Sequence, residues 1–577
     1  MNNTARIIKN DLSLVLCGGA GQGIQSVEQF LVKILAREGF YIYATKEYMS
    51  RVRGGSNSTT IRISSHPKRA PVARMDILIP LDDKALEHMA PRLSAETVVF
   101  GDEEAVKPPR DASWRFVDIP FSKAAIEIGG PVFANMIAAG FLAGLMGVAK
   151  AISQSLLETF FAGAGADIIA KDAAALERGY DEAAKVLERN IIAVEIDRHE
   201  NRSGDILING AEAVALGALA GGCDFIAAYP MSPSTGVLTF LAGQSLDFEI
   251  VVEQAEDEIA AINMMLGAWY AGARAMVTTS GGGFALMEEA LSLAGVSETP
   301  AVIHLAQRPG PATGLATRTE QADLNLVLYA GQGEFPRVIF APGTLEEAAA
   351  LTRRAFDLAD RFQVQAFVLT DQYFMDTYYT LRSLDVGADP LARHIEETDE
   401  SYRRYRITEE GVSPRGVPGF GDGLVVADSH EHTEDGHITE NLQVRPEMVN
   451  KRLRKLDLLR QEALPPLVTG DEGAEIAVIC WGSTYPIVQE ALAGMARPDV
   501  CLVSFSQVYP LSGETKDLLG RARKIIAVEG NATGQFSRLI ALEMGFNVHG
   551  KLLKYDGLSF TVEEVIEGLS RILSEGV

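Results

Sequence analysis

Cysteine is scarce in this sequence of 577 residues. The four cysteines are Cys17, Cys223, Cys480 and Cys501. Because no two of them lie within a few residues of each other, the chain has no CxxC pair and no run of ligands for zinc or an iron–sulfur cluster. So few cysteines in so long a chain also exclude the disulfide framework of a small secreted domain, and we expect a cytoplasmic protein.

Positive charge is also in short supply, because 52 lysines and arginines stand against 77 aspartates and glutamates and leave a net charge of -25. Nucleic-acid-binding proteins concentrate positive charge, so we expect no nucleic-acid partner. Long hydrophobic runs are missing too. No stretch reaches the roughly 18 uncharged apolar residues of a spanning helix, and the N-terminus lacks the apolar core of a signal peptide. We therefore expect no membrane partner.

The sequence does contain a repeated pattern of a short apolar run, then glycine or a turn, then a helical period. The clearest runs occupy residues 12–17, 97–102, 225–230, 275–283, 301–310, 337–342, 366–371, 476–483, 500–505 and 524–531. Solid apolar strands separated by helices predict parallel sheets that are buried on both faces. The length indicates about three or four domains, so we expect an α/β protein with several parallel sheets.

Two stretches interrupt this rhythm and suggest domain boundaries. Residues 187–206 are charged and end in a polar run, which predicts a linker at 191–206. Residues 386–465 carry scattered charge, proline and glycine, and only their end has a helical period. A structureless segment of that length is unusual, so we expect part of this excursion to pack on the protein. The remaining chain forms three predicted α/β units, at 1–190, 207–385 and 466–577.

A glycine-rich loop follows the first strong strand and precedes a helix at 24–39. Backbone N–H groups and the helix dipole make such a loop a cradle for anions. The dinucleotide fingerprint is broken, because Ile24 stands at its third glycine position, and the next strand, at 40–44, does not end in an acidic residue. NAD is therefore disfavoured. The candidates for an anion contact are Gly19, Gly21 and Gly23, and the alternative is that these glycines serve tight strand–helix packing.

The central unit contains a carboxylate at the start of an apolar helix. Glu256, Asp257 and Glu258 begin this helix, and acidic residues in a first turn are commonly explained by the helix dipole. Glu258, however, flanks the most apolar part of the helix. A desolvated carboxyl group there would be suited to donate a proton to a ring nitrogen.

Two loops follow strands of the same unit, where ligands bind in parallel sheets. The loop after residues 225–230 is rigid and rich in hydroxyl groups, with the sequence MSPSTG. The loop that begins at Arg308 carries a second arginine, Arg318, and several threonines, including Thr317. A guanidinium with hydroxyl groups makes a carboxylate clamp. The alternative is an arginine that pins the loop to an acidic neighbour.

These motifs resemble those of one enzyme family along nearly the whole chain. They are GGAGQG at 18–23, YPMSPST at 229–235, EQAEDEIAAINMMLGAWYAGARA at 253–275, TSGGGFALMEEALSLAG at 279–295, QRPGPATGLATRTEQADL at 307–324, SPRGVPG at 413–419, EHTEDGHITE at 431–440 and VEGNATGQ at 528–535. The chain resembles the α subunit of 2-oxoacid:ferredoxin oxidoreductases of the 2-oxoglutarate type, with the γ domain fused at its N-terminus. The resemblance implies a γ-like domain at 1–190, a thiamine-diphosphate-binding domain of the pyrimidine type at 207–385 and a transketolase-C-like domain at 466–577.

The resemblance also implies a reaction. Members of the family join a 2-oxoacid to thiamine diphosphate, decarboxylate it, pass electrons through iron–sulfur clusters to ferredoxin and release an acyl-CoA. We expect 2-oxoglutarate as the substrate and coenzyme A as co-substrate, in contact with the γ-like domain. Pyruvate and branched-chain 2-oxoacids are alternatives, as is a thiamine-dependent transferase without redox chemistry. A nucleotide- or CoA-binding module is a third reading, but it leaves the central loops unexplained.

The family pattern assigns roles to residues of the central unit. It implies that Glu258 hydrogen-bonds the aminopyrimidine ring of the cofactor, and that Arg308 and Thr317 hold the 2-oxoacid carboxylate. Ser232 stands where the family has threonine and keeps the hydroxyl donor, while Met231 replaces an isoleucine. The same loop contributes further contacts to substrate and cofactor, from Tyr229, Pro230 and Pro233. Arg318 is the nearest candidate for a second substrate carboxylate.

Ligands for magnesium and the diphosphate are missing from this chain. Gly421-Asp422-Gly423, followed by Asn450, imitates the usual motif, but no parallel strand precedes it. The histidines of residues 428–437 lie among acidic residues, and we interpret them as a solvated loop and not as a metal site. Magnesium, the diphosphate site and the iron–sulfur cluster are therefore expected in a separate β subunit, within an (αβ)2 dimer of heterodimers to which ferredoxin docks mainly through β.

Overall fold

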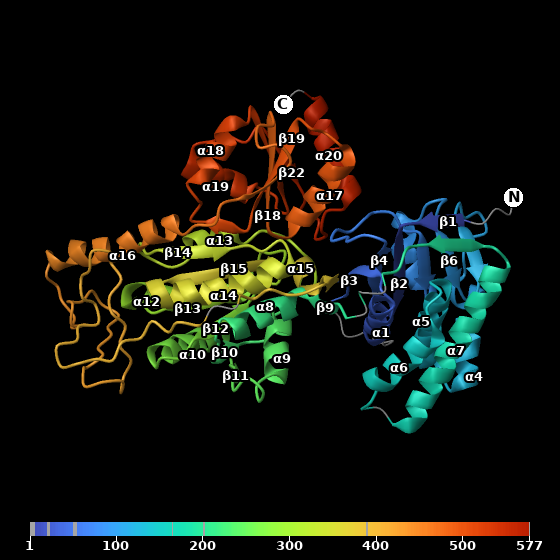
Figure 1. Cartoon of the computed structure of the whole chain (residues 1–577), viewed down its shortest axis with the longest axis horizontal. Coiled ribbons are helices and arrows are strands. Elements are labelled where there is room, and N and C mark those ends of the chain that lie inside the picture. Colours follow the sequence, from blue (N-terminus) through green and yellow to red (C-terminus); the bar gives the residue numbers. More distant parts are fainter. Residues whose placement is uncertain are drawn as a thin grey trace. The chain divides into compact units, whose positions relative to one another are not determined.

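The computed structural model describes residues 6–19, 24–49, 55–163, 165–199, 202, 204–387 and 390–575. The chain divides into two compact units (Figure 1). The N-terminal unit comprises Met1–Ile208 with Asp376–Ser383, and the C-terminal unit comprises Asn209–Met375 with Leu384–Val577. Across the described ranges, no helix combines the length and the apolar character that crossing a bilayer requires.

The N-terminal unit is built on an eight-stranded sheet with the order β7-β6-β5-β2-β4-β3-β16-β9. Its strands are β2 (Asp11–Gly19), β3 (Tyr41–Glu47), β4 (Ser56–Ser64), β5 (Ile77–Pro80), β6 (Val98–Gly101), β7 (Arg115–Asp118), β9 (Ile206–Asn209) and β16 (Tyr378–Leu381). Strands β7, β6, β5 and β2 are parallel to one another, whereas β4 is antiparallel to β2 and β3, and β16 is antiparallel to β3. This sheet is mixed, because neighbouring strands β3 and β4 pair directly as antiparallel strands and β16 returns from a distant part of the chain.

The helices of this unit pack on one another with very close backbone contacts. The main ones are α1 (Ile24–Arg37), α5 (Ala134–Leu145) and α7 (Ala166–Glu188). A Cβ atom on Gly140 or Gly179 would lie 2.1 Å from a carbonyl oxygen of the facing helix, so α5 and α7 require glycine at their crossing. The stretch predicted as a linker contains β8 (Ile192–Glu195), which pairs in parallel with β1 (Arg6–Lys9).

The C-terminal unit contains a seven-stranded central sheet with the order β11-β10-β12-β13-β15-β14-β20. Its strands are β10 (Phe225–Ala228), β11 (Val251–Gln254), β12 (Ala275–Thr279), β13 (Ala301–Gln307), β14 (Arg337–Phe340), β15 (Gln365–Asp371) and β20 (Gln507–Tyr509). All neighbours are parallel except β14 and β20. Every residue of β12, β13 and β15 is buried, as expected for parallel strands covered on both faces. Covering helices are α8 (Gly210–Ala220), α9 (Thr235–Gly243), α10 (Glu258–Tyr270), α12 (Glu288–Ser297) and α14 (Leu345–Phe362).

A second sheet of five strands, with the order β17-β19-β18-β21-β22, closes the same unit. Its strands are β17 (Leu467–Thr469), β18 (Ile476–Trp481), β19 (Val500–Phe505), β21 (Lys524–Glu529) and β22 (Gly550–Leu553). Only β17 is antiparallel to its neighbour. The helices that pack around this five-stranded sheet are α17 (Tyr485–Met495), α18 (Glu514–Arg521), α19 (Gln535–Met544) and α20 (Val562–Ser574). The predicted α/β class with mostly parallel sheets is confirmed.

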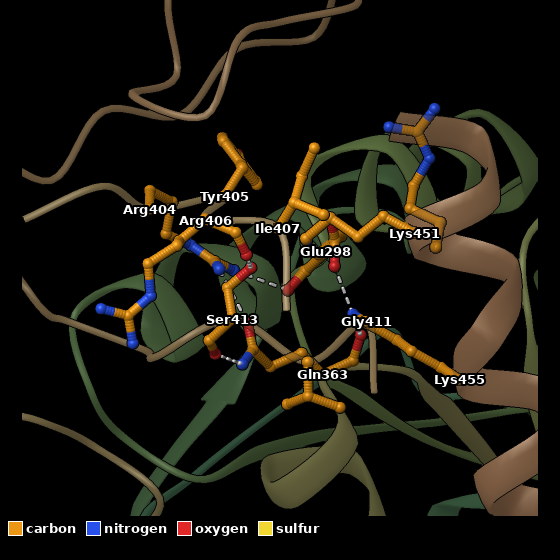
Figure 2. Close-up of polar contacts among 12 residues, drawn as sticks. Glu298, Gln363, Arg404, Tyr405, Arg406, Ile407, Gly411, Ser413, Lys451 and Lys455 are labelled. Carbon is orange, nitrogen blue, oxygen red and sulfur yellow. Dashed lines mark hydrogen bonds and ion pairs between the residues drawn. The ribbon is translucent and has the colours of Figure 1, made fainter. Parts of the chain in front are cut away.

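The excursion before the second sheet is largely irregular but packs on the central domain through α16 (Val444–Gln461) and the preceding loops. Figure 2 shows its anchor: Lys451 and Lys455 of α16 both pair with Glu298, and the Lys451 Nζ to Glu298 Oε1 distance is 2.6 Å. Arg404 donates to the Glu298 carbonyl (2.8 Å) and to Gln363 Oε1 (2.7 Å). The expectation that part of the excursion packs on the protein is confirmed.

Candidate functional site

The carboxyl ends of β11, β10, β12 and β13 meet at one edge of the central sheet, and unsatisfied polar atoms lie in the segments that follow β11, β12 and β13. Among the described residues, Glu258 Oε1, Ser280 Oγ, Arg308 Nε and Asp323 Oδ2 are buried and have no hydrogen-bond partner. Buried polar atoms almost always have a partner in a folded protein. The grouping of such atoms at one sheet edge makes this edge a candidate ligand site.

Glu258 is the first residue of α10 and is only 4% exposed. The capping of this helix is performed by its neighbour, because Asp257 Oδ1 accepts from the backbone N–H of Ala260 at 2.7 Å. Asp257 therefore caps the helix, and the Glu258 side chain is not needed for capping. The Glu258 carboxyl group is left buried, with one oxygen free to bind a donor.

Three consecutive glycines, Gly281–Gly283, separate two carboxyl groups at this edge. A Cβ atom on Gly283 would lie 2.2 Å from Thr279 Oγ1 and 2.8 Å from Glu258 Oε1. On the other side, a Cβ atom on Gly281 would lie 2.3 Å from Asp323 Oδ2. Gly282 is exposed, and its Cβ position has only one neighbour, a carbonyl oxygen at 3.7 Å. The two outer glycines are thus required by close contacts, whereas the middle one faces open space.

The loop after β10 is held rigidly and presents its side chains outward. The Ser232–Pro233 peptide bond is cis, and Ser234 Oγ donates to the Met231 carbonyl at 2.7 Å. Tyr229 is 40% exposed, and Pro230 and Ser232 are exposed as well. The predicted binding residues of this loop are therefore accessible, while Pro233 is buried beneath them.

A buried histidine is linked to that loop through a threonine of β12. His304 of β13 bridges Thr278 Oγ1 (2.7 Å) and Thr370 Oγ1 (2.9 Å), and Thr278 Oγ1 in turn lies 3.4 Å from the Ser234 carbonyl. Burial lowers the pKa of His304 to about 3, so the ring is neutral at working pH. It is a structural support, and the sequence pattern did not single it out.

Arg308 follows β13 and is fixed to the loop after β10. Its Nη1 donates to the Ser232 carbonyl at 2.7 Å. Burial lowers the pKa of Arg308, whereas the nearby Asp323 carboxylate raises it. Two residues predicted to act together, Ser232 and Arg308, are thus in direct contact, and the Arg308 Nε–H remains available.

The loop that begins at Arg308 is anchored on both sheets of the C-terminal unit, through β15 of the central sheet and β18 of the second sheet. Thr319 Oγ1 donates to Asp371 Oδ1 at 3.0 Å, and Gln321 Nε2 donates to the Trp481 carbonyl at 2.8 Å. Thr317 is half-buried in this loop. Arg318 lies beside Gly557, where its Cβ is 3.2 Å from the glycine's Cβ position. The assignment of Arg318 to a second substrate carboxylate stays a prediction.

The predicted anion loop lies mostly outside the described residues. Gly21 and Gly23 fall in the gap after β2. Gly19 is described, and its backbone N–H donates to Asp82 Oδ2 at 3.1 Å, a carboxylate of the protein itself.

The acidic and histidine-containing loop at 428–437 is held by ion pairs. Glu431 pairs with Arg445 and Arg452, and His432 stacks on Tyr405 with ring centroids 3.8 Å apart. In the ranges that the structure describes, histidine, cysteine and acidic side chains form no group of three or more that could hold a metal ion. Gly421 is bridged to Thr398 and does not follow a parallel strand.

Comparisons with known proteins connect this site to a family. Residues 216–451 match the family model described as pyruvate flavodoxin/ferredoxin oxidoreductase, thiamine diphosphate-binding, and residues 13–182 match the model described as pyruvate ferredoxin/flavodoxin oxidoreductase. The α subunit of a 2-oxoacid:ferredoxin oxidoreductase from a Sulfolobus species is 29% identical over 98% of this chain and 97% of its own. The KorA subunit of 2-oxoglutarate oxidoreductase from Mycobacterium tuberculosis is 31% identical over 61% of this chain and 54% of its own.

The fold of the chain is also similar to that of a solved enzyme. The 2-oxoglutarate:ferredoxin oxidoreductase from Magnetococcus marinus, with 2-oxoglutarate, coenzyme A and succinyl-CoA bound, matches with a TM-score of 0.91 and 29% identity. The match covers 98% of this chain and 100% of that one. Likeness in sequence and fold over almost the full length shows that this chain belongs to the 2-oxoacid:ferredoxin oxidoreductases, as an α subunit.

Proposed function

We propose that this chain is the catalytic α subunit of a CoA-dependent 2-oxoglutarate:ferredoxin oxidoreductase, with the γ-like domain fused at its N-terminus. The enzyme would convert 2-oxoglutarate to an acyl-CoA and CO2 and pass the electrons to ferredoxin. The observation that carries the proposal is the unpartnered, buried carboxyl oxygen of Glu258 beside Gly283. The similarity to a solved enzyme with 2-oxoglutarate bound supports the choice of substrate.

The residues at this edge fit thiamine diphosphate. When bound, this cofactor supplies the carbon nucleophile and the electron sink that decarboxylation of a 2-oxoacid requires. Glu258 offers its free carboxyl oxygen to an N–H of the aminopyrimidine ring, and burial from water strengthens that hydrogen bond. Ser232 and Pro233 line the same side of the site.

We assign the substrate carboxylate to Arg308, with Thr317, Ser232, Tyr229 and Pro230 around it. The guanidinium is already oriented, because Arg308 Nη1 is fixed on the Ser232 carbonyl at 2.7 Å and Arg308 Nε has no partner. A preoriented, partly buried guanidinium loses little entropy on binding and discriminates in favour of a planar carboxylate. A pyruvate- or branched-chain-specific enzyme is the alternative that a substrate panel would reveal.

The remaining parts of the reaction are assigned to partner proteins and to the N-terminal domain of this chain. We infer a β subunit that holds magnesium, the diphosphate site and the iron–sulfur cluster, in an (αβ)2 assembly that delivers electrons to ferredoxin, and a γ-like domain at residues 1–190 that contacts coenzyme A. Exposed apolar side chains next to the site support an interface there, since Ile259 adjoins Glu258 and Leu286 follows the glycine turn.

The test is CoA-dependent reduction of a viologen dye by the reconstituted αβ complex with a panel of 2-oxoacids. We expect Glu258→Gln to lower turnover by more than about 100-fold, because the amide cannot replace the carboxylate as proton carrier. Glu256→Gln is the matched control, since Glu256 is exposed two residues earlier. Unchanged turnover in the Glu258 variant, with the complex intact by light scattering, would refute the assigned role.

A further inference from the structure

Asp323 occupies an unusual position for an aspartate at the start of a helix. It is the N-cap residue of α13 (Leu324–Tyr329), yet its side chain makes no capping hydrogen bond. The carboxyl group instead lies against Gly281, and its Oδ2 is buried without a partner among the described residues. Its own backbone N–H donates to Gln307 Oε1 at 2.9 Å, which ties it to the residue before Arg308. The N-terminus of α13 therefore has no side-chain cap, and the Asp323 carboxyl group lies beside the glycine turn instead.

The surroundings of Asp323 contain two charged groups that act on it. Arg308 comes from the end of β13, and Glu320 comes from the same loop as Asp323. The glycine turn Gly281–Gly283 contributes only backbone, and Glu258 lies at its far end. Burial, and then the Glu320 charge, raise the pKa of Asp323 to about 7, while Arg308 opposes them. The guanidinium is therefore the attraction that favours the ionised form of this carboxyl group.

We propose that Asp323 takes up a proton from solvent when a substrate carboxylate binds Arg308, so that it acts as a proton-linked positioning residue for 2-oxoacid binding. The proposal rests on the function proposed above. An anion on Arg308 cancels the attraction that stabilises ionised Asp323 and adds a like charge nearby, so the proton becomes more tightly bound. One substrate carboxylate enters and one proton moves from water to Asp323, with no change in oxidation state.

The proposal predicts how substrate affinity changes with pH. Above about pH 7, the proton must be taken from an increasingly basic solution, so KM for 2-oxoglutarate should rise, at most about tenfold per pH unit. We expect the KM of the wild-type αβ complex to increase several-fold between pH 6.5 and 8.5. The isosteric Asp323→Asn variant should lose this increase, whereas kcat should change with pH as in the wild type.

Glu320→Gln provides a matched comparison. Removing the Glu320 charge lowers the pKa of Asp323, so KM should begin to rise at a lower pH in this variant. A KM profile of Asp323→Asn that superimposes on the wild-type profile would overturn the proposal, as would an unshifted profile of Glu320→Gln.

Calorimetry gives a readout that does not depend on turnover. Oxamate, a non-reacting analogue with a carboxylate beside a carbonyl, is titrated into the αβ complex at pH 7.5 in two buffers with different ionisation enthalpies. We expect the wild type to take up a fraction of a proton and Asp323→Asn to take up none. Oxamate binding without proton uptake by the wild type would overturn this inference alone. A complex that turns over no 2-oxoacid at any pH would instead overturn the proposed function.

Discussion

At the scale of single residues, the site is built from polar groups that the fold leaves unsatisfied. Glu258 and Asp323 lie on opposite sides of the turn Gly281–Gly283, and Arg308 is fixed to the loop that faces them. Each unpartnered buried polar atom costs about 1–3 kcal/mol, so a cluster of them at one sheet edge is expected where a ligand binds. The glycines allow the two carboxyl groups to approach the backbone so closely.

The glycine turn makes a direct test of this geometry. In Gly283→Ala the new methyl group would lie 2.8 Å from Glu258 Oε1, so we expect the carboxyl group to be displaced. Turnover of the αβ complex should fall about tenfold or more, which corresponds to at least about 1.4 kcal/mol in the activation barrier. Gly282→Ala is the control, because its methyl group meets only one oxygen at 3.7 Å. Equal activity of the two variants would contradict the role of Gly283.

The sequence predicted some of these residues and missed others for a physical reason. Glu258, Ser232 and Arg308 belong to local patterns, a strand end followed by a loop or a helix start, which can be seen in sequence. Asp323 looks like an ordinary helix cap, and only the folded chain reveals that it does not cap α13. His304 is one polar residue in a buried strand, and its bridge between Thr278 and Thr370 joins three separate strands.

At the scale of helices and strands, local sequence patterns predicted the parallel strands well and the pairings less well. All ten predicted runs contain a strand, from β2 to β21. The antiparallel β16 was not predicted, since its partner β3 lies more than 300 residues earlier in the chain. The same holds for β20, which adds to the central sheet from within the second α/β region. Period and composition carry no information about such distant partners.

The packing of α16 predicts a pH dependence of stability. Burial lowers the pKa of Lys455 to about 7, although Glu298 opposes the shift. The unfolded chain retains a lysine pKa near 10.4, so between about pH 7 and 10 unfolding takes up a proton and stability rises with pH. The slope from this group is at most about 1.4 kcal/mol per pH unit.

The free energy of unfolding, measured in guanidinium chloride at several pH values between 7 and 10, gives this slope. Lys455→Met fills the same space without a titrating group, so we expect its stability to rise less steeply with pH than that of the wild type. Lys516→Met on the exposed face of α18 should leave the slope unchanged. Parallel curves for Lys455→Met and the wild type would show that Lys455 stays charged in the folded protein.

At the scale of the whole molecule, the net charge of -25 and the scarcity of cysteine fit a subunit that depends on a partner for redox chemistry. Ferredoxins are acidic, so a strongly acidic α subunit would repel them, and we expect docking mainly on the β subunit. A β subunit that completes the proposed cofactor site would also have to reach Glu258. Its contact surface should therefore include the exposed apolar residues around the glycine turn and the start of α10.

Ile259 tests where the partner binds. It is 50% exposed next to the buried Glu258, so a lysine at this position would be compatible with the fold and would place a charge in the expected interface. We expect Ile259→Lys to prevent or strongly weaken formation of the αβ complex in size-exclusion chromatography with light scattering, while the thermal unfolding of the chain alone stays unchanged. Leu542→Lys on α19 is the control, since Leu542 is 67% exposed and lies on the second sheet's helical layer. If Ile259→Lys assembles as readily as Leu542→Lys, the β subunit does not approach the cofactor from the start of α10, and the interface must lie on another face of the C-terminal unit.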